Sequence, residues 1–279
     1  EDYSGVADWI EAQILIREGW SASVIHVENL MLEVGLTDYE DYIAGALNIL
    51  RQRAKQLGDY YPIEMKGQHF IKSRSGREPN DLYKALLILS LIDSSKNDQN
   101  NSEFGELFEI ICEPLLRNLG GAGGNSLHFG WPTRSGRPQK FPHAIQWLAK
   151  KLSLDVGKGH IPKQRKDGGV DLVVWRTQPN GESMNLNLVQ CTLQNDVSKK
   201  AKDIDTRLWE TWISFPQTPG IILAVPFTVP DRDMELKSLK LQGYVVLTRL
   251  DLVKLGKNLT NEQIIKHKFK EIFKLADEV

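Results

Sequence analysis

Two polar residues, Asp171 and Gln190, stand at the ends of two apolar segments that have the length and composition of neighbouring strands. Asp171 is near the start of residues 170–177, and Gln190 is near the end of residues 184–193. The Asn180-Gly181 pair between them is typical of a hairpin turn, because both turn residues must tolerate positive φ. In such a hairpin the start of the first strand lies beside the end of the second. We therefore expect the carboxylate and the carboxamide to lie close together.

These residue types predict a site for a hard metal ion. Alternate side chains of a strand share a face, so Gln190 and Thr192 point the same way. Asp171, Gln190 and the Cys191 backbone carbonyl would then form an oxygen-rich environment suited to Mg²⁺ (or Mn²⁺). A metal ion held there would neutralise phosphate charge and generate hydroxide, which is the chemistry of phosphodiester cleavage. The structural alternative is that Gln190 is a buried amide bonded to backbone and Asp171 a capping carboxylate.

The rest of the chain predicts two domains. Residues 1–95 carry apolar side chains at helical spacing, which predicts an all-helical N-terminal domain for partner or DNA contact. Residues 96–103 contain no apolar side chain and predict a linker. Residues 104–250 alternate between helices and strands, which predicts an α/β domain with three layers and a mixed central sheet. Further helices extend that domain to residue 279.

One helix of this second domain follows the hairpin directly. Asn195-Asp196 is an N-cap signal, and the apolar pattern predicts a continuous helix from there to Ile213. Lys199 and Lys200 fall in its first turn, close behind the end of the second strand.

Charge is segregated along the chain although the net charge is only −1. Residues 1–41 carry ten Asp and Glu against one Arg, whereas residues 117–170 carry ten Lys and Arg against two Asp. The basic segment predicts a polyanionic partner. The candidate nucleic-acid contacts are Arg134, Arg137, Lys140, Lys163, Arg165 and Lys166. The alternative for the loop that carries the first three is a glycine-rich connector with solvated charges.

Other classes of protein are disfavoured. No apolar run approaches the ~20 residues that cross a bilayer, so no membrane partner is expected. Cys112 and Cys191 each lie in an apolar segment and form no CxxC or Cys/His pattern, which argues against zinc. Buried free thiols are typical of a reduced compartment and predict a cytoplasmic protein.

Three segments in order resemble the PD-(D/E)XK nuclease superfamily and, more narrowly, the Mrr-like restriction endonucleases. They are G-E-L-F-E at residues 105–109, D-G-G-V-D-L-V-V at 167–174 and L-V-Q-C at 188–191. The resemblance covers about residues 104–250 and implies a restriction-endonuclease-like core. It also implies that Asp171 and Gln190 bind the metal with the Cys191 carbonyl, and that Glu109 completes the site. The implied function is a metal-dependent endonuclease acting on DNA, in a bacterial restriction or anti-phage defence system.

Thr192 departs from this pattern because the family places a lysine there. Three interpretations are open. Lys200, or else Lys199, reaches the site from the following helix; the metal works without a lysine; or the domain binds nucleic acid without cutting it. In the third interpretation the protein is a non-catalytic subunit that binds DNA or a partner ATPase or helicase. The acidic first 41 residues suit a protein partner, because DNA would repel them. A homodimer is a further expected state.

Overall fold

The computed structural model describes residues 3–16, 21–33, 39–67, 69–72, 78–92, 99–121, 123–134, 136–178, 183–229, 233–258 and 263–277. The chain divides into two compact units. The first comprises Glu1–Ile92, Pro226–Asp231 and Thr248–Val279, and the second comprises Asp93–Val225 and Arg232–Leu247.

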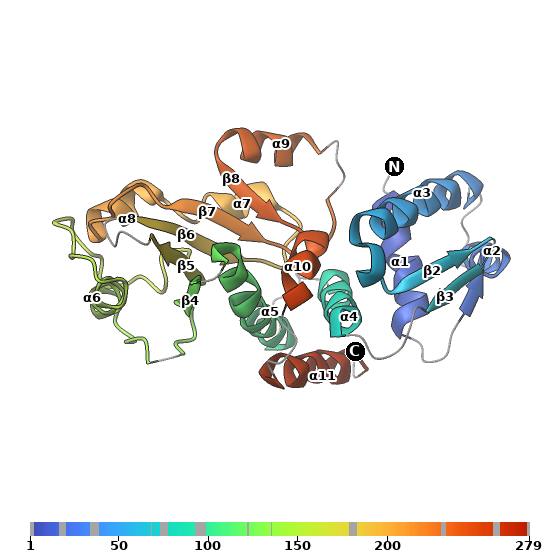
Figure 1. The fold of residues 1–279 in the computed structure, drawn as a ribbon, viewed down its shortest axis with the longest axis horizontal. Coiled ribbons are helices and arrows are strands. Elements are labelled where there is room, and N and C mark those ends of the chain that lie inside the picture. Colours follow the sequence, from blue (N-terminus) through green and yellow to red (C-terminus); the bar gives the residue numbers. More distant parts are fainter. Residues whose placement is uncertain are drawn as a thin grey trace. The chain divides into compact units, whose positions relative to one another are not determined.

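The second unit is built on a five-stranded mixed sheet with strand order β4-β5-β6-β7-β8 (Figure 1). The strands are β4 (Asn125–His128), β5 (Leu172–Thr177), β6 (Met184–Cys191), β7 (Gly220–Ala224) and β8 (Tyr244–Leu247). The first three pair antiparallel, and β6, β7 and β8 pair parallel. The β5-β6 pair is the predicted hairpin, although its Asn180-Gly181 turn lies outside the described residues.

Helices cover both faces of this sheet. α5 (Gln99–Arg117) packs against β4, β5 and β6, and the short η2 turn (Asn118–Gly120) follows it. On the other face, Val173 and Leu188 join a core with α6 (Phe141–Leu152) and α8 (Thr206–Trp212). α7 (Val197–Ala201) and α9 (Met234–Leu241) complete the unit. The predicted α/β class with three layers and a mixed sheet is confirmed.

The helix predicted from Asp196 to Ile213 is interrupted. It forms as α7 and α8, with residues 202–205 between them. The reason is local, because the Asp205 side chain accepts hydrogen bonds from the backbone N–H groups of Arg207 and Leu208 and so begins a new helix. The interruption leaves Asp203 in a connector beside the end of β6.

The first unit is mainly helical, with α1 (Tyr3–Ile16), α2 (Val24–Glu33), α3 (Tyr39–Leu57), α4 (Glu78–Leu91), α10 (Arg249–Leu255) and α11 (Gln263–Asp277), and two 3-10 turns, η1 (Gly58–Tyr60) and η3 (Gly256–Asn258). It also holds an antiparallel sheet of order β1-β3-β2. The strands are β1 (Ser21–Ser23), β2 (Ile63–Lys66) and β3 (His69–Lys72). The N-terminal region is therefore helical as predicted, but "all-helical" is too narrow, because these short segments pair through their backbones instead of showing a long periodic pattern.

A buried ion network explains why C-terminal residues belong to this first unit. Arg249, at the start of α10, is fully buried and contacts the Asp8 carboxylate at 2.9 Å and the Glu11 carboxylate at 3.2 Å. Arg53 of α3 contacts the same two acids at 2.6 and 2.8 Å. A guanidinium buried to this degree must be paired, and the acids of α1 pair with it while α10 packs against α3 and α4. The predicted division into residues 1–95 and 104–279 therefore differs from the grouping in the structure.

Part of the predicted linker at residues 96–103 is helical. α5 begins at Gln99, so residues 99–103 form its first turns, while residues 96–98 lie outside the described part of the chain. Polar side chains are compatible with the solvent side of a helix, and Ser102 and Glu103 are exposed there. Composition alone could not separate such a helix start from a linker.

Candidate active site

Asp171 directly precedes β5, and its carboxylate lies beside the end of β6. Its backbone N–H donates to the Val189 carbonyl at 2.9 Å, and its Oδ2 accepts from the Cys191 backbone N–H at 2.8 Å. The β5-β6 register, in which Leu172 faces Val189, sets Asp171 opposite Gln190. The structure therefore brings these two predicted residues together.

In the Gln190 amide the NH₂ group has a hydrogen-bond partner, whereas the oxygen has none among the described residues. Its Nε2 donates to Asp203 Oδ2 at 3.1 Å. Its Oε1 is buried and has no hydrogen-bond partner among the described residues. An orphaned buried oxygen is costly unless something else occupies its lone pairs. The lone pairs of this atom are therefore not occupied by any described group.

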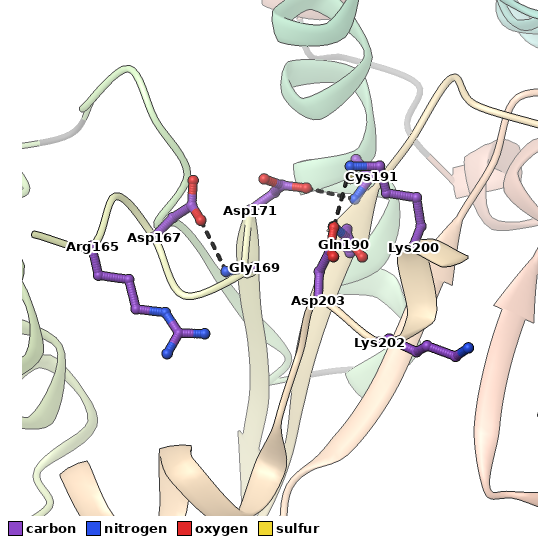
Figure 2. A pocket seen from close by; sticks show the side chains of 9 residues that line it. All are labelled: Arg165, Asp167, Gly169, Asp171, Gln190, Cys191, Lys200, Lys202 and Asp203. Atoms are coloured by element: carbon purple, nitrogen blue, oxygen red, sulfur yellow. Dashed lines mark hydrogen bonds and ion pairs between the residues drawn. The ribbon is translucent and has the colours of Figure 1, made fainter. Parts of the chain in front are cut away.

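Both side chains line a cavity of about 520 Å³ (Figure 2). The lining residues are Arg165, Asp167, Gly169, Asp171, Gln190, Cys191, Lys200, Lys202 and Asp203. The lining is polar and carries charges of both signs. Carboxylates can hold a cation there, and the lysines and arginine can hold phosphate oxygens.

Of the two candidate lysines, Lys200 is the one at the cavity. Its ammonium lies 3.2 Å from Asp203 Oδ2, and its positive charge acts to lower the pKa of Asp171. Lys199 is exposed and does not line the cavity. Thr192 is buried, and its Oγ1 accepts a hydrogen bond from the Gln194 backbone N–H at 3.0 Å. This side chain therefore stabilises the turn of the backbone that follows β6.

Glu109 of α5 is not among the residues that line the cavity. Its Oε2 is 2.7 Å from Nε2 of His128, a side chain that is 2% exposed. Burial raises the pKa of Glu109 to about 7, with the Glu106 and Asp167 charges adding to the effect and Arg134 opposing it. Burial and the nearby Arg134 charge lower the pKa of His128 to about 4. At neutral pH the His128 imidazole is thus uncharged, and it contacts the Glu109 carboxyl group, which loses its proton near pH 7.

The electrostatics around Asp171 favour a bound cation. Burial and then the Glu109 carboxylate raise the pKa of Asp171 well above its ordinary range, despite the hydrogen bond from Cys191. Two buried acids so placed repel each other when ionised, and a cation removes that repulsion.

The donor set fits Mg²⁺. Among the described residues no three His, Cys, Asp or Glu side chains lie close enough to hold a metal by themselves. Mg²⁺ requires only one or two carboxylates and completes its shell with neutral oxygens and water. Asp171 and the free Gln190 Oε1 match that need, with the Cys191 carbonyl and Asp203 at the same cavity.

The predicted nucleic-acid residues separate into two groups. Lys140, Lys163 and Lys166 are exposed. Arg165 is half-buried, lies 5.2 Å from the Trp212 ring and lines the cavity.

The two loop arginines are engaged within the protein. Arg134 contacts Glu106 Oε2 at 2.9 Å. Arg137 is 4% exposed, lies 4.4 Å from the Phe129 ring and donates to the Lys166 carbonyl at 2.5 Å. Its guanidinium thus holds the loop to the segment before β5, and its contact with nucleic acid stays a prediction.

Replacing Arg137 by methionine is expected to cost roughly 1–3 kcal/mol of unfolding free energy, because it leaves the Lys166 carbonyl without its donor. The change should leave the salt dependence of DNA affinity unaltered. Lys163→Met, at an exposed site, should leave stability within about 0.5 kcal/mol and reduce the salt slope by about one. Urea unfolding and DNA titrations at several salt concentrations measure both quantities. The opposite pattern would return Arg137 to the binding surface.

Three residues that line the cavity, Asp167, Lys202 and Asp203, were not predicted as site residues from the sequence. Asp203 and Lys202 fall in the break between α7 and α8, within a segment predicted as one helix. Asp167 bonds the Gly169 backbone N–H through Oδ1 at 2.9 Å and shapes the loop before Asp171. The available signal was Asp205-Thr206, a second N-cap pair inside the predicted helix.

Comparison with known proteins finds little. No family model matches the chain, and no curated protein matches it. Among solved structures, the restriction endonuclease FokI is similar at 10% sequence identity and a TM-score of 0.26. The alignment covers 96% of this chain and 46% of FokI, so the chain spans about half of that protein's length. The function is therefore argued from the site. Within the described part of the chain, no helix has the length and apolar character to span a bilayer.

Proposed function

We propose that the protein is a metal-dependent nuclease that hydrolyses DNA phosphodiester bonds at the cavity around Asp171. One observation carries the proposal. Asp171 and Gln190, whose buried Oε1 has no hydrogen-bond partner among the described residues, line a cavity together with Lys200, Lys202 and Arg165. Oxygen donors for a metal and cations for a phosphate group thus meet at one place, at the end of two central strands.

Each residue has a distinct role in this proposal. Asp171 and Gln190 would hold Mg²⁺ or Mn²⁺ with the Cys191 carbonyl, and Glu109 would act behind Asp171 through its charge. The bound metal supplies phosphate neutralisation and an activated water. Lys200 would stabilise the negative charge that develops on the phosphate. It would take the role of the lysine that the family places at the position of Thr192.

The surroundings of the cavity support a polyanionic substrate. The exposed Lys163 and Lys166 stand in the segment that leads to Asp171, next to Arg165 on the cavity wall. Such charges position a phosphate backbone without reading its sequence. The sequence resemblance supports a restriction or anti-phage role in a bacterial cytoplasm. The first unit would select the target or dock a partner, either a second copy or an ATPase or helicase.

Supercoiled plasmid is the direct test. The protein is expected to nick or linearise it with Mg²⁺ or Mn²⁺ and to leave it intact with EDTA. Salt-dependent affinity for the same DNA should remain when Ca²⁺ replaces Mg²⁺. Plasmid that survives every divalent metal at saturating protein contradicts the nuclease proposal.

A second candidate is a nuclease-fold subunit that binds DNA or a partner without cutting, and Thr192 in place of the strand lysine favours it. This candidate predicts DNA binding that weakens with salt, no cleavage, and no loss of affinity in Asp171→Ala. Cleavage by the purified chain that disappears in Asp171→Ala excludes it.

A further inference from the structure

Asp203 connects two groups of the candidate site. Its Oδ2 accepts from Gln190 Nε2 at 3.1 Å and from Lys200 Nζ at 3.2 Å (Figure 2). One carboxylate oxygen therefore contacts both the amide that would ligate the metal and the ammonium that would face the phosphate. Nothing in the sequence pattern assigned a role to this residue.

The contact determines which end of the Gln190 amide faces the ligand. An ionised carboxylate only accepts hydrogen bonds, so the amide must turn its NH₂ group toward Asp203. The opposite orientation would set Oε1 against a carboxylate oxygen, with repulsion in place of a bond. Oε1 is consequently left buried and without a partner among the described residues. Mg²⁺ takes oxygen ligands, so only this orientation of the amide is useful to it.

Asp203 itself is held firmly in place. Its backbone N–H donates to the Lys200 carbonyl at 3.0 Å, and the next residue, Ile204, is buried. The Gly169 backbone comes so close that a Cβ there would collide with the Asp203 carbonyl, and Gly169 has φ of 82°. The loop before Asp171 and the connector that carries Asp203 are thus fitted to each other.

We infer that Asp203 is a positioning residue, which orients the Gln190 amide so that its oxygen faces the metal and holds the Lys200 ammonium at the cavity. The inference rests on the proposed function. Lysine has a long, flexible side chain, so a fixed counter-charge reduces the freedom it loses when a phosphate binds. Removing the carboxylate frees the amide to turn and the lysine to move away.

A double-mutant cycle on the full-length chain tests the amide part of this role through Mn²⁺ binding, measured by calorimetry without DNA. Asp203→Ala should weaken Mn²⁺ binding about 10–100-fold, as loss of a partner behind a metal ligand does elsewhere. In a Gln190→Glu background the same change should cost nothing, because both carboxylate oxygens can ligate and no orientation is needed. A merely structural role would cost the same factor in both backgrounds.

The control is Asp155→Ala, which removes an exposed aspartate of the same unit outside the cavity lining and should bind Mn²⁺ like the wild type. Suppose the wild type binds Mn²⁺ and cleaves DNA. An Asp203→Ala variant that matches it, or that loses an equal factor in both backgrounds, then overturns the positioning role while the proposed function stands. A wild type that neither binds Mn²⁺ nor cleaves overturns the proposed function and, with it, this inference.

Discussion

Replacing Asp171 by asparagine is expected to reduce DNA cleavage by at least roughly 10²–10³-fold, the effect of removing one preorganised charge-stabilising group in other active sites. The same change should raise the unfolding free energy of the metal-free protein by about 1 kcal/mol or more. Asparagine retains an acceptor for the Cys191 N–H and is neutral without taking up a proton, whereas burial and then the Glu109 charge make the ionised form of Asp171 costly. Activity and stability are thus predicted to change in opposite directions.

The pH dependence of that stability difference follows from the raised pKa of Asp171. A carboxyl group with a raised folded-state pKa contributes most stability below its unfolded value of about 3.9, and this contribution is lost as pH rises through the folded value. The gap between Asp171→Asn and the wild type should therefore be near zero at about pH 4 and widen toward neutrality. Mg²⁺ should stabilise the wild type and not the variant.

Thermal unfolding across pH, with and without Mg²⁺, measures these effects, and plasmid cleavage measures the activity. Asp155→Asn is the matched control, since it removes an exposed carboxylate of the same unit. A variant that is less stable than the wild type at neutral pH would show that the charge at Asp171 is satisfied within the protein. The site would then have no electrostatic need for a cation.

Replacing Arg249 by methionine is expected to destabilise the first unit by about 3–5 kcal/mol, because it leaves Asp8 and Glu11 buried with one guanidinium instead of two. Burial acts to raise the pKa of Asp8, but Arg249 and Arg53 bring it below its ordinary range, so the acid is charged and needs its partners. The Tyr61 and Tyr83 hydroxyls donate to Glu11 at 2.6 and 2.8 Å but cannot replace the lost charge.

Urea unfolding measures this effect, and Arg51→Met is the control, because Arg51 is exposed on α3 and should change stability by less than about 0.5 kcal/mol. The fragment of residues 1–95 lacks Arg249 altogether and should fail to fold cooperatively. A folded fragment, or a cost below about 1 kcal/mol for Arg249→Met, would show that the network is dispensable and that the N-terminal region is an independent domain.

The adjacency of Asp171 and Gln190 was predictable because it depends on local rules. A turn dipeptide between two apolar segments determines the pairing, and pairing sets the start of one strand beside the end of the next. The alternation of helices and strands likewise predicted the mixed sheet, since each element follows from a periodicity within about ten residues. The roles of these residues in metal binding stay predictions.

Tertiary structure alone decided the rest, because those contacts join residues that no local pattern relates. Arg137 has the charge and setting of a nucleic-acid contact, yet it packs on Phe129 and bonds Lys166. Asp203 falls inside the segment predicted as one continuous helix, and only the break between α7 and α8 brings it to Gln190. Arg249 has no sequence neighbour that marks it as buried, and only folding sets it against Asp8. Sequence alone predicted that β5 pairs with β6 and which polar groups lie at the ends of that pair, whereas the other strand pairs came from the tertiary structure. Folding determined the partner of each buried charge, because burial makes a partner obligatory while many partners satisfy the same charge.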